Sequence, residues 1–216
     1  MIPVSDAVRS RTTPYVNIAL IISCVLVFLY ELTLSELDLN RFFIDHGVIP
    51  VQLVNWLKEP SGLDEPLTVI TSAFMHGGFL HLGGNMLFLW VFGDNVEDFF
   101  GHLPYLLFYL VCGIGAGLLH ILFNLNSSLP AVGASGAISG VMGAYALLYP
   151  RARVLTLVFV FLVPIPAIFI LGYWFLLQFL GGISALGATA TGGVAWWAHV
   201  GGFLVGLSLT ELARRE

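Results

Sequence analysis

The chain has 216 residues, of which 58% are hydrophobic and only 10% are charged, with a formal net charge of −5. Soluble domains carry about 25% charged residues, so this composition excludes an ordinary water-soluble domain. With a mean hydropathy of +0.92, it is typical of a protein that crosses a membrane several times. The sequence has no basic patch, so no nucleic-acid partner is expected.

Residues 1–15 form a polar segment that we expect in the cytoplasm. The apolar run that follows lacks a small-residue cleavage site, which favours a retained span over a signal peptide. A helix needs roughly 20 apolar residues to cross a bilayer, and the sequence has six candidate spans, at about 16–33, 73–93, 104–124, 131–149, 154–180 and 194–212. The predicted fold is therefore an all-α, six-helix membrane bundle that forms one domain over 16–213.

Two regions between or within these spans differ from a simple helix or a simple turn. The fifth span contains Pro164 and Pro166, so we expect it to begin as a bent or interfacial segment. The long first loop, about 34–72, contains "RFFIDHGVIPVQLVNWL", which favours short helices lying in the membrane interface.

The basic residues predict the orientation, because cytoplasmic loops carry an excess of Lys and Arg. With six spans and a cytoplasmic N-terminus, only Arg41 and Lys58 lie outside, both in the long first loop. The other basic residues all fall on the cytoplasmic side: Arg9, Arg11, Arg151, Arg153, Arg214 and Arg215. Both termini are therefore expected in the cytoplasm.

Polar side chains inside spans are costly and often mark function. Besides His120 in the third span, they are concentrated in spans two, four and six: His76, His81, Asn85, Ser135, Ser139 and His199. These three spans enter from the outer face, so at 1.5 Å per residue His81, Ser135 and His199 lie within roughly 10 Å of that face. Asn85 lies one turn below His81 on the same side of the helix.

Small residues predict that the fourth and sixth spans are neighbours. "AVGASGAISGVMGAY" contains Gly136 and Gly140 at G-x-x-x-G spacing, and Gly202 and Gly206 repeat that spacing in the sixth span. Close approach would bring Ser135 to His199. Considered without its neighbours, Ser135 is better interpreted as a packing residue than as a nucleophile. We interpret Ser139 as a packing residue as well. A hydroxyl and an imidazole at one depth instead favour a nucleophile with its general base.

His81 and Asn85 admit two interpretations. They can donate hydrogen bonds to the oxyanion of a tetrahedral intermediate, together with the Ser135 backbone N–H. Alternatively, His76, His81 and His199 can hold zinc, but no acidic residue lies near and the H-E-x-x-H motif is absent, so we expect no metal and no other cofactor. Paired intramembrane aspartates and midplane charge pairs, typical of aspartyl proteases and transporters, are also missing.

Three motifs, "HGGFLHLGGN", "GASG" and "WWAHVGG", lie in this order on spans two, four and six. With "FGDNVED" and "SRTTPYVN", they closely resemble the bacterial-type rhomboid intramembrane serine proteases, over about residues 10–213. The resemblance implies a Ser135–His199 dyad without an aspartate, and an oxyanion site of His81, Asn85 and the Ser135 amide. It also implies supporting positions at His76, Gly133, Gly136, Gly202 and Glu97.

The chain departs from the family pattern in two places. Some members have an aromatic residue stacked on the base at the position of Ser139, and the first loop has no clear Trp-Arg pair. The expected function is still cleavage of single-span membrane proteins near the outer face of a bacterial or archaeal cell membrane. The fifth span, with Pro164, Pro166 and Gly172, is the expected lateral gate. An inactive relative that binds membrane proteins and a purely structural bundle are the alternatives; the sequence leaves substrate and oligomeric state open.

Overall fold

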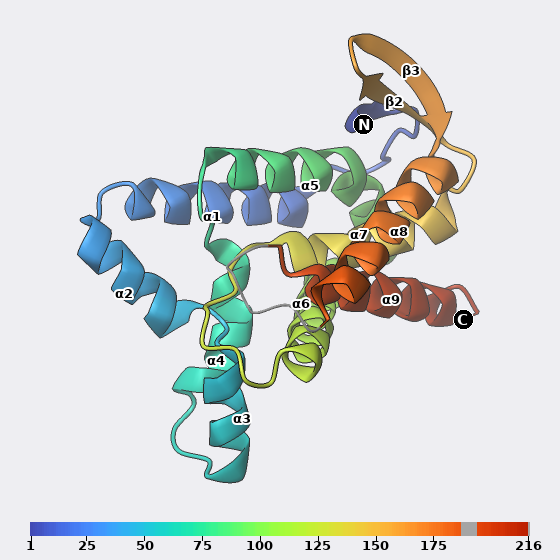
Figure 1. Cartoon of the computed structure of the whole chain (residues 1–216). Helices are drawn as coiled ribbons and strands as arrows, with labels where there is room; N and C mark the ends of the chain where they lie inside the picture. Colours follow the sequence, from blue (N-terminus) through green and yellow to red (C-terminus); the bar gives the residue numbers. More distant parts are fainter. Residues whose placement is uncertain (187–193, 216) are drawn as a thin grey trace.

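The computed structural model describes residues 1–186 and 194–215, and it is mostly helical (Figure 1). The helices are α1 (Tyr15–Glu31), α2 (Glu36–His46), α3 (Pro50–Lys58), α4 (Asp64–Thr71), the 3-10 turn η1 (Ser72–Phe74), α5 (Phe79–Phe100), α6 (His102–Phe123), α7 (Ser135–Leu148), α8 (Ala167–Ala185) and α9 (Trp196–Ala213). The strands are β1 (Ile2–Asp6), β2 (Arg153–Val158) and β3 (Phe161–Pro166).

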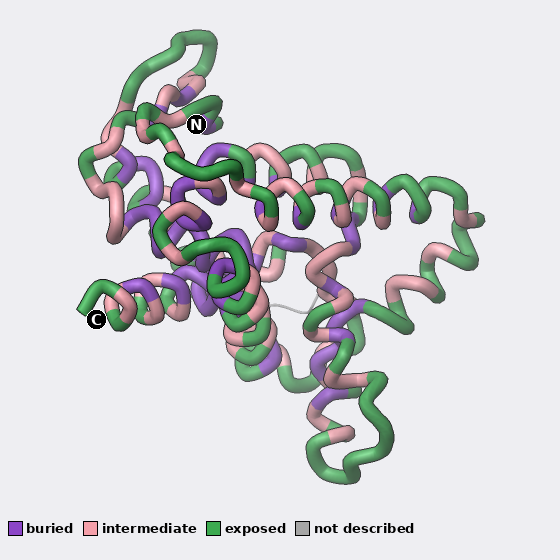
Figure 2. Tube along the Cα trace, turned by 180° about the vertical axis from the view of Figure 1, so that it is seen from behind, coloured by how far each residue is buried: buried purple, intermediate pink, exposed green. Residues whose placement is uncertain are grey.

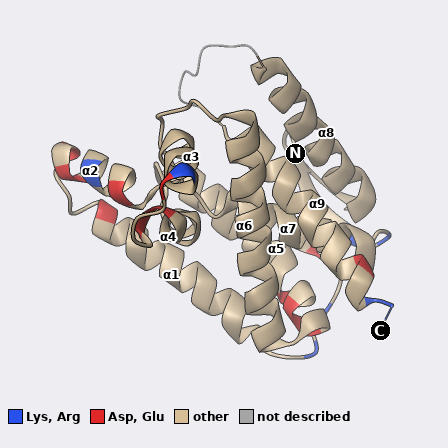
Figure 3. Ribbon diagram, turned by 90° about the horizontal axis from the view of Figure 1, so that it is seen from below, with Lys and Arg blue, Asp and Glu red and all other residues tan. Residues whose placement is uncertain are grey.

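Three helices of the bundle are uncharged. Helices α6, α7 and α8 contain no Asp, Glu, Lys or Arg. Within the described residues, α6 and α8 are long and apolar enough to span a membrane, and α1 and α7 are shorter apolar helices. Charged residues gather around α2–α4 and, at the other end, near the C-terminus (Figure 3).

The region expected to begin the fifth span is a β-hairpin, so the prediction that this span starts at about residue 154 is wrong, and the mostly helical fold also contains a small sheet. Strands β2 and β3 pair antiparallel, and β1 adds to the other side of β2 to give the order β1-β2-β3. Pro164 and Pro166 lie in β3, an edge strand, where a missing N–H is tolerated. The helix of this region, α8, begins only at Ala167.

The other predicted spans correspond to helices with shifted ends. Helix α5 begins at Phe79, six residues later than predicted, and continues to Phe100. Helix α7 begins at Ser135 itself rather than at residue 131. The remaining three, α1, α6 and α9, start within two residues of the prediction, and the first loop contains the three short helices α2, α3 and α4.

Helix α7 is the centre of the molecule, and its contact with α9 is made by backbone atoms. Nearly every residue of α7 is buried, whereas α2 and the hairpin are largely exposed (Figure 2). A Cβ at Gly202 would lie 1.9 Å from the Gly136 carbonyl oxygen, and one at Gly206 would lie 2.0 Å from that of Gly140. Only glycine permits these approaches, which set the spacing of the two helices.

Both terminal segments meet the same end of α7, far from Ser135. The Tyr145 hydroxyl donates a hydrogen bond to the Asp6 carboxylate, and Arg214 donates to the Leu147 carbonyl oxygen at 3.4 Å. Nearby, the buried Glu97 carboxylate accepts the first N–H groups of α1, from Val16 at 3.0 Å and Asn17 at 2.7 Å. These contacts fasten the N-terminal segment and α1 to α5 and α7.

Candidate active site

Ser135 is the first residue of α7, and the loop before it is held in place by backbone hydrogen bonds. Val48 and Ala131 exchange backbone hydrogen bonds of 3.0 and 2.8 Å, and the Gly133 N–H donates to the Ser72 carbonyl at 2.8 Å. The first N–H groups of a helix have no partner within it, and the helix dipole makes this end positive. The Ser135 hydroxyl and amide therefore lie where developing negative charge is stabilised.

His199 lies in the first turn of α9, and its imidazole contacts Ser135 directly. Its Nε2 atom is 2.8 Å from Ser135 Oγ, and its Nδ1 atom is 2.8 Å from Oε1 of Gln178 on α8. A carbonyl oxygen only accepts hydrogen bonds, so Nδ1 carries the proton and donates it to Gln178. Nε2 is then free to accept the proton of the Ser135 hydroxyl.

Sequence reasoning missed two residues of α8 that hold the imidazole. Gln178 is buried, and the Trp174 ring lies tilted beside the His199 ring with centroids 5.7 Å apart. Trp174 thus supplies the aromatic neighbour that α7 does not provide, because α7 has Ser139 at that position, which is buried and donates to the Ser135 carbonyl at 2.5 Å. The available signal was Gln178 itself, an amide within an expected membrane span.

His81 and Asn85, in the first two turns of α5, face the same site. The Gly77 N–H donates to Nδ1 of His81 at 3.3 Å, so a neutral His81 carries its proton on Nε2. That Nε2 lies so close to Gly133 that a Cβ on the glycine would be 2.6 Å away. Asn85 Nδ2 is buried and has no hydrogen-bond partner among the described residues. Both side chains therefore present unused donors to the site.

His76 and His120 lie at the edge of this arrangement. His76 precedes α5, is buried, and packs its ring 5.1 Å from the ring of His81. Its backbone N–H donates to the buried Glu31 carboxylate, which fastens the start of α5 to the end of α1. His120 sits on α6, where Asn124 donates to its carbonyl at 2.8 Å.

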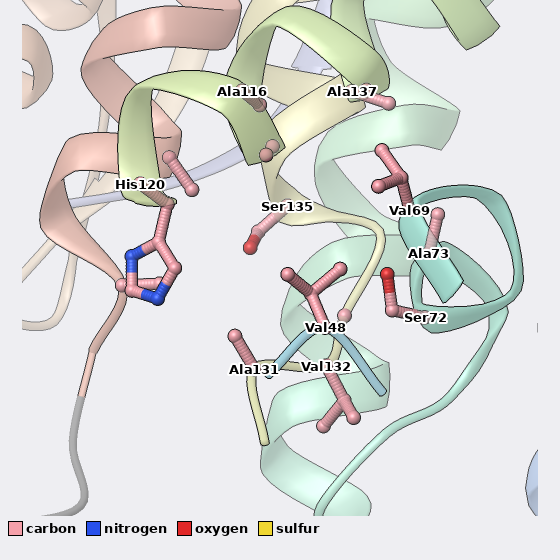
Figure 4. A pocket seen from close by; sticks show the side chains of 16 residues that line it. Val48, Val69, Ser72, Ala73, Ala116, His120, Ala131, Val132, Ser135 and Ala137 are labelled. Atoms are coloured by element: carbon pink, nitrogen blue, oxygen red, sulfur yellow. The ribbon is translucent and has the colours of Figure 1, made fainter. Parts of the chain in front are cut away.

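Two cavities adjoin the Ser135 hydroxyl. The smaller one, about 50 Å³, is shown in Figure 4, where the hydroxyl points into a space bounded by His120, Ser72 and small apolar side chains. The larger one, about 880 Å³, is lined by His81 and Asn85 on one side, Trp174 on another, and His199. None of its described lining residues is charged. Across residues 1–186 and 194–215, no three His, Cys, Asp or Glu side chains gather to hold a metal.

Comparison with known proteins places this chain in a family. The family model described as the Rhomboid domain matches residues 64–216, most of the chain. The chain belongs to the rhomboid family. Rhomboid proteins are membrane proteins, in agreement with the uncharged helices described above.

Individual rhomboid relatives come from organelles and from bacteria. The chain is 34% identical over 148 residues to "Rhomboid protein 1, mitochondrial" of Saccharomyces cerevisiae, covering 65% of this chain and 40% of the yeast protein. It is 41% identical over 91 residues to "RHOMBOID-like protein 6, mitochondrial" of Arabidopsis thaliana, covering 42% and 29%. It is 41% identical over 76 residues to "Rhomboid protease GluP" of Bacillus subtilis, covering 35% and 14%. The matches thus span less than half of each relative's length.

Proposed function

We propose that this rhomboid is an active intramembrane serine endopeptidase, with Ser135 as nucleophile and His199 as general base. The observation that supports it best is the 2.8 Å separation of His199 Nε2 and Ser135 Oγ. A serine hydroxyl near neutral pH needs an adjacent base to become nucleophilic. The tautomer set by Gln178 leaves Nε2 available for that role.

In the proposed acylation step, Ser135 Oγ attacks the carbonyl carbon of the scissile peptide bond. The hydroxyl proton moves to His199 Nε2 as the new C–O bond forms. When the tetrahedral intermediate collapses, the same proton passes to the leaving amine, and an acyl-enzyme remains on Ser135. Water, activated by the same imidazole, hydrolyses the ester and regenerates the hydroxyl.

The oxyanion of that intermediate would be held by donors that the site leaves unused. The Ser135 N–H starts α7, and the side chains of His81 and Asn85 reach the same cavity from α5. The positive end of the α7 dipole adds to their effect. Each such donor is worth about 2.7–4 kcal/mol of transition-state stabilisation in enzymes of known mechanism.

The proposed setting is a bilayer crossed by α1, α5, α6, α7, α8 and α9, with both termini in the cytoplasm of a bacterial or archaeal cell. Single-span proteins would enter sideways from the lipid, between α5 and α8, into the 880 Å³ cavity that these helices line. Helix α8, including Gly172, would move as the gate. Pro164 and Pro166 belong to β3 and take no part in it.

The proposal is tested by reconstituting the protein in liposomes with a model transmembrane substrate. We expect cleavage by the wild type and a loss of about 10⁴-fold or more in both Ser135→Ala and His199→Ala. Cleavage should persist with a strong chelator, since the proposed chemistry uses no metal. Activity that survives Ser135→Ala would contradict the serine mechanism. Absence of cleavage across several substrates would favour an inactive, substrate-binding rhomboid.

A further inference from the structure

We infer that Gln178 of α8 is a positioning residue for the catalytic base, so that α8 both borders the substrate cavity and keeps the Ser135–His199 dyad competent. This inference rests on the proposed function of the dyad. Its first support is the 2.8 Å contact between Gln178 Oε1 and His199 Nδ1, a pair that is buried. Buried polar groups carry a large penalty when unpaired, so this contact defines the ring orientation.

The orientation of the Gln178 amide is itself determined by its second contact. Its Nε2 donates to the Trp174 carbonyl, one turn earlier on α8, at 3.3 Å. With the NH₂ group engaged there, the carbonyl oxygen faces His199 and accepts the Nδ1 proton. The opposite neutral tautomer would put a proton on Nε2, facing Ser135, and remove the acceptor that the nucleophile needs.

A neutral amide suits this environment better than a carboxylate. The other titratable groups facing the imidazole are His81 of α5 and His120 of α6, and no charged side chain lines the cavity among its described residues. An ionised carboxylate is expensive inside a bilayer and would favour the imidazolium, which cannot act as a base. Gln178 orients the ring and polarises it without adding charge.

Helix α8 contributes a second contact to the same ring. Trp174 lies beside His199 with centroids 5.7 Å apart, and Phe175 packs on Phe203 of α9 with centroids 4.7 Å apart. Ser139 offers no ring in their place. Side chains of α8 therefore hold the His199 imidazole in its orientation. A displacement of α8 away from α9 would remove these contacts and leave the ring free to rotate.

The test compares Gln178→Met, which keeps the length of the side chain and loses the strong acceptor, with Gln178→Glu, which keeps an acceptor. We expect Gln178→Met to lower kcat about 10- to 100-fold, with KM changed less than about 2-fold. Gln178→Glu should restore most of kcat at alkaline pH, and the acidic limb of its pH profile should move upward by about one pH unit or more, since a carboxylate favours the imidazolium. Ser184→Ala, which removes an exposed hydroxyl of α8 whose hydrogen bond among the described residues is to the Leu180 carbonyl of the same helix, is the matched control and should behave as wild type.

A second measurement does not depend on proteolysis. Side-chain ¹⁵N resonances of His199, assigned by their loss in His199→Ala, report which ring nitrogen carries the proton. In Ser135→Ala protein we expect the proton on Nδ1, and in Ser135→Ala/Gln178→Met a shift toward Nε2. An unchanged tautomer, or equal losses of kcat in Gln178→Met and Gln178→Glu at alkaline pH, would overturn the inference. Absence of cleavage by the wild type with the expected tautomer change would overturn the proposed function alone.

Discussion

Gly133 is the residue on which the shape of the proposed oxyanion site depends most directly. Its φ of 125° lies in a region that side-chain-bearing residues rarely adopt. Beyond this strain, a methyl group there would overlap the His81 imidazole, whose Nε2 would be 2.6 Å away. Because Gly133 has no side chain, the backbone can adopt the turn before Ser135, and the His81 imidazole can reach the site.

Gly133→Ala should therefore lose catalysis while leaving the fold largely intact. Displacing one oxyanion donor costs about 10²–10³ in kcat, and we expect a loss of that order. It is measured by initial cleavage rates in liposomes, beside thermal unfolding in detergent. Gly83→Ala, at an exposed position of α5, is the control, because a Cβ there meets nothing within 4 Å. Wild-type kcat in Gly133→Ala would show that His81 takes no part in the reaction.

At the scale of elements, the β-sheet is the part of the fold that the sequence concealed. "RVLTLVFVFLVPIP" is a continuous apolar run, and such a run does not distinguish a strand from a buried helix by its periodicity. Besides β3, strand β2 pairs with β1, about 150 residues earlier in the chain, which no local pattern reveals. The helices α1, α6 and α9, by contrast, were located to within about two residues at each end.

The same distinction applies to the site. His81, Ser135 and His199 stood out because each is polar in an apolar helix and all three fall at one depth. Gln178 lies farther from the start of its helix than those three residues do. Because α8 begins at Ala167 and not at about residue 154, the sequence did not show which residues Gln178 would face. The contact between Gln178 and His199 depends on how α8 packs against α9, and this packing cannot be inferred from a single sequence.

The attachment of β1 to α7 should depend on pH. Burial raises the pKa of the Asp6 carboxyl above its ordinary 3.8, and the hydrogen bond from Tyr145 offsets only part of this rise. The folded state therefore favours the protonated acid. This contribution to stability is fully present below about pH 3.8 and is lost as pH rises through the higher pKa of the folded protein.

Asp6→Asn keeps an acceptor for Tyr145 and removes the charge, so it should flatten this dependence. We expect the unfolding temperature of the wild type, relative to that of Asp6→Asn, to fall as pH rises from about 4 to 7. Asp45→Asn, at an exposed position of α2, controls for a general effect of charge. A constant difference between wild type and Asp6→Asn over this range would contradict the prediction.

For the whole molecule, the separation of charges into two zones predicts how it lies in the membrane. Lys58 is the last residue of α3, and Arg151 lies three residues after the end of α7. Single cysteines at these exposed positions should react with an impermeant maleimide from opposite sides: Lys58→Cys in intact cells, Arg151→Cys only after permeabilisation. Cys24 and Cys112 are buried, so the parent protein should give little background. Labelling of both variants from one side would exclude the proposed topology.

The backbone contact of α7 with α9 has a mechanical consequence. Where helices touch through side chains, rotamer changes let them slide; where glycine meets a carbonyl oxygen, as Gly202 meets Gly136, there is nothing to rearrange. We expect these two helices to tilt as one stiff body when the bilayer thins or thickens, so that the serine and the imidazole keep their separation. A change in the lipid would then mainly move α8. This helix contacts the α7–α9 pair through the side chains of Phe175 and Gln178, so it can shift without distorting that pair.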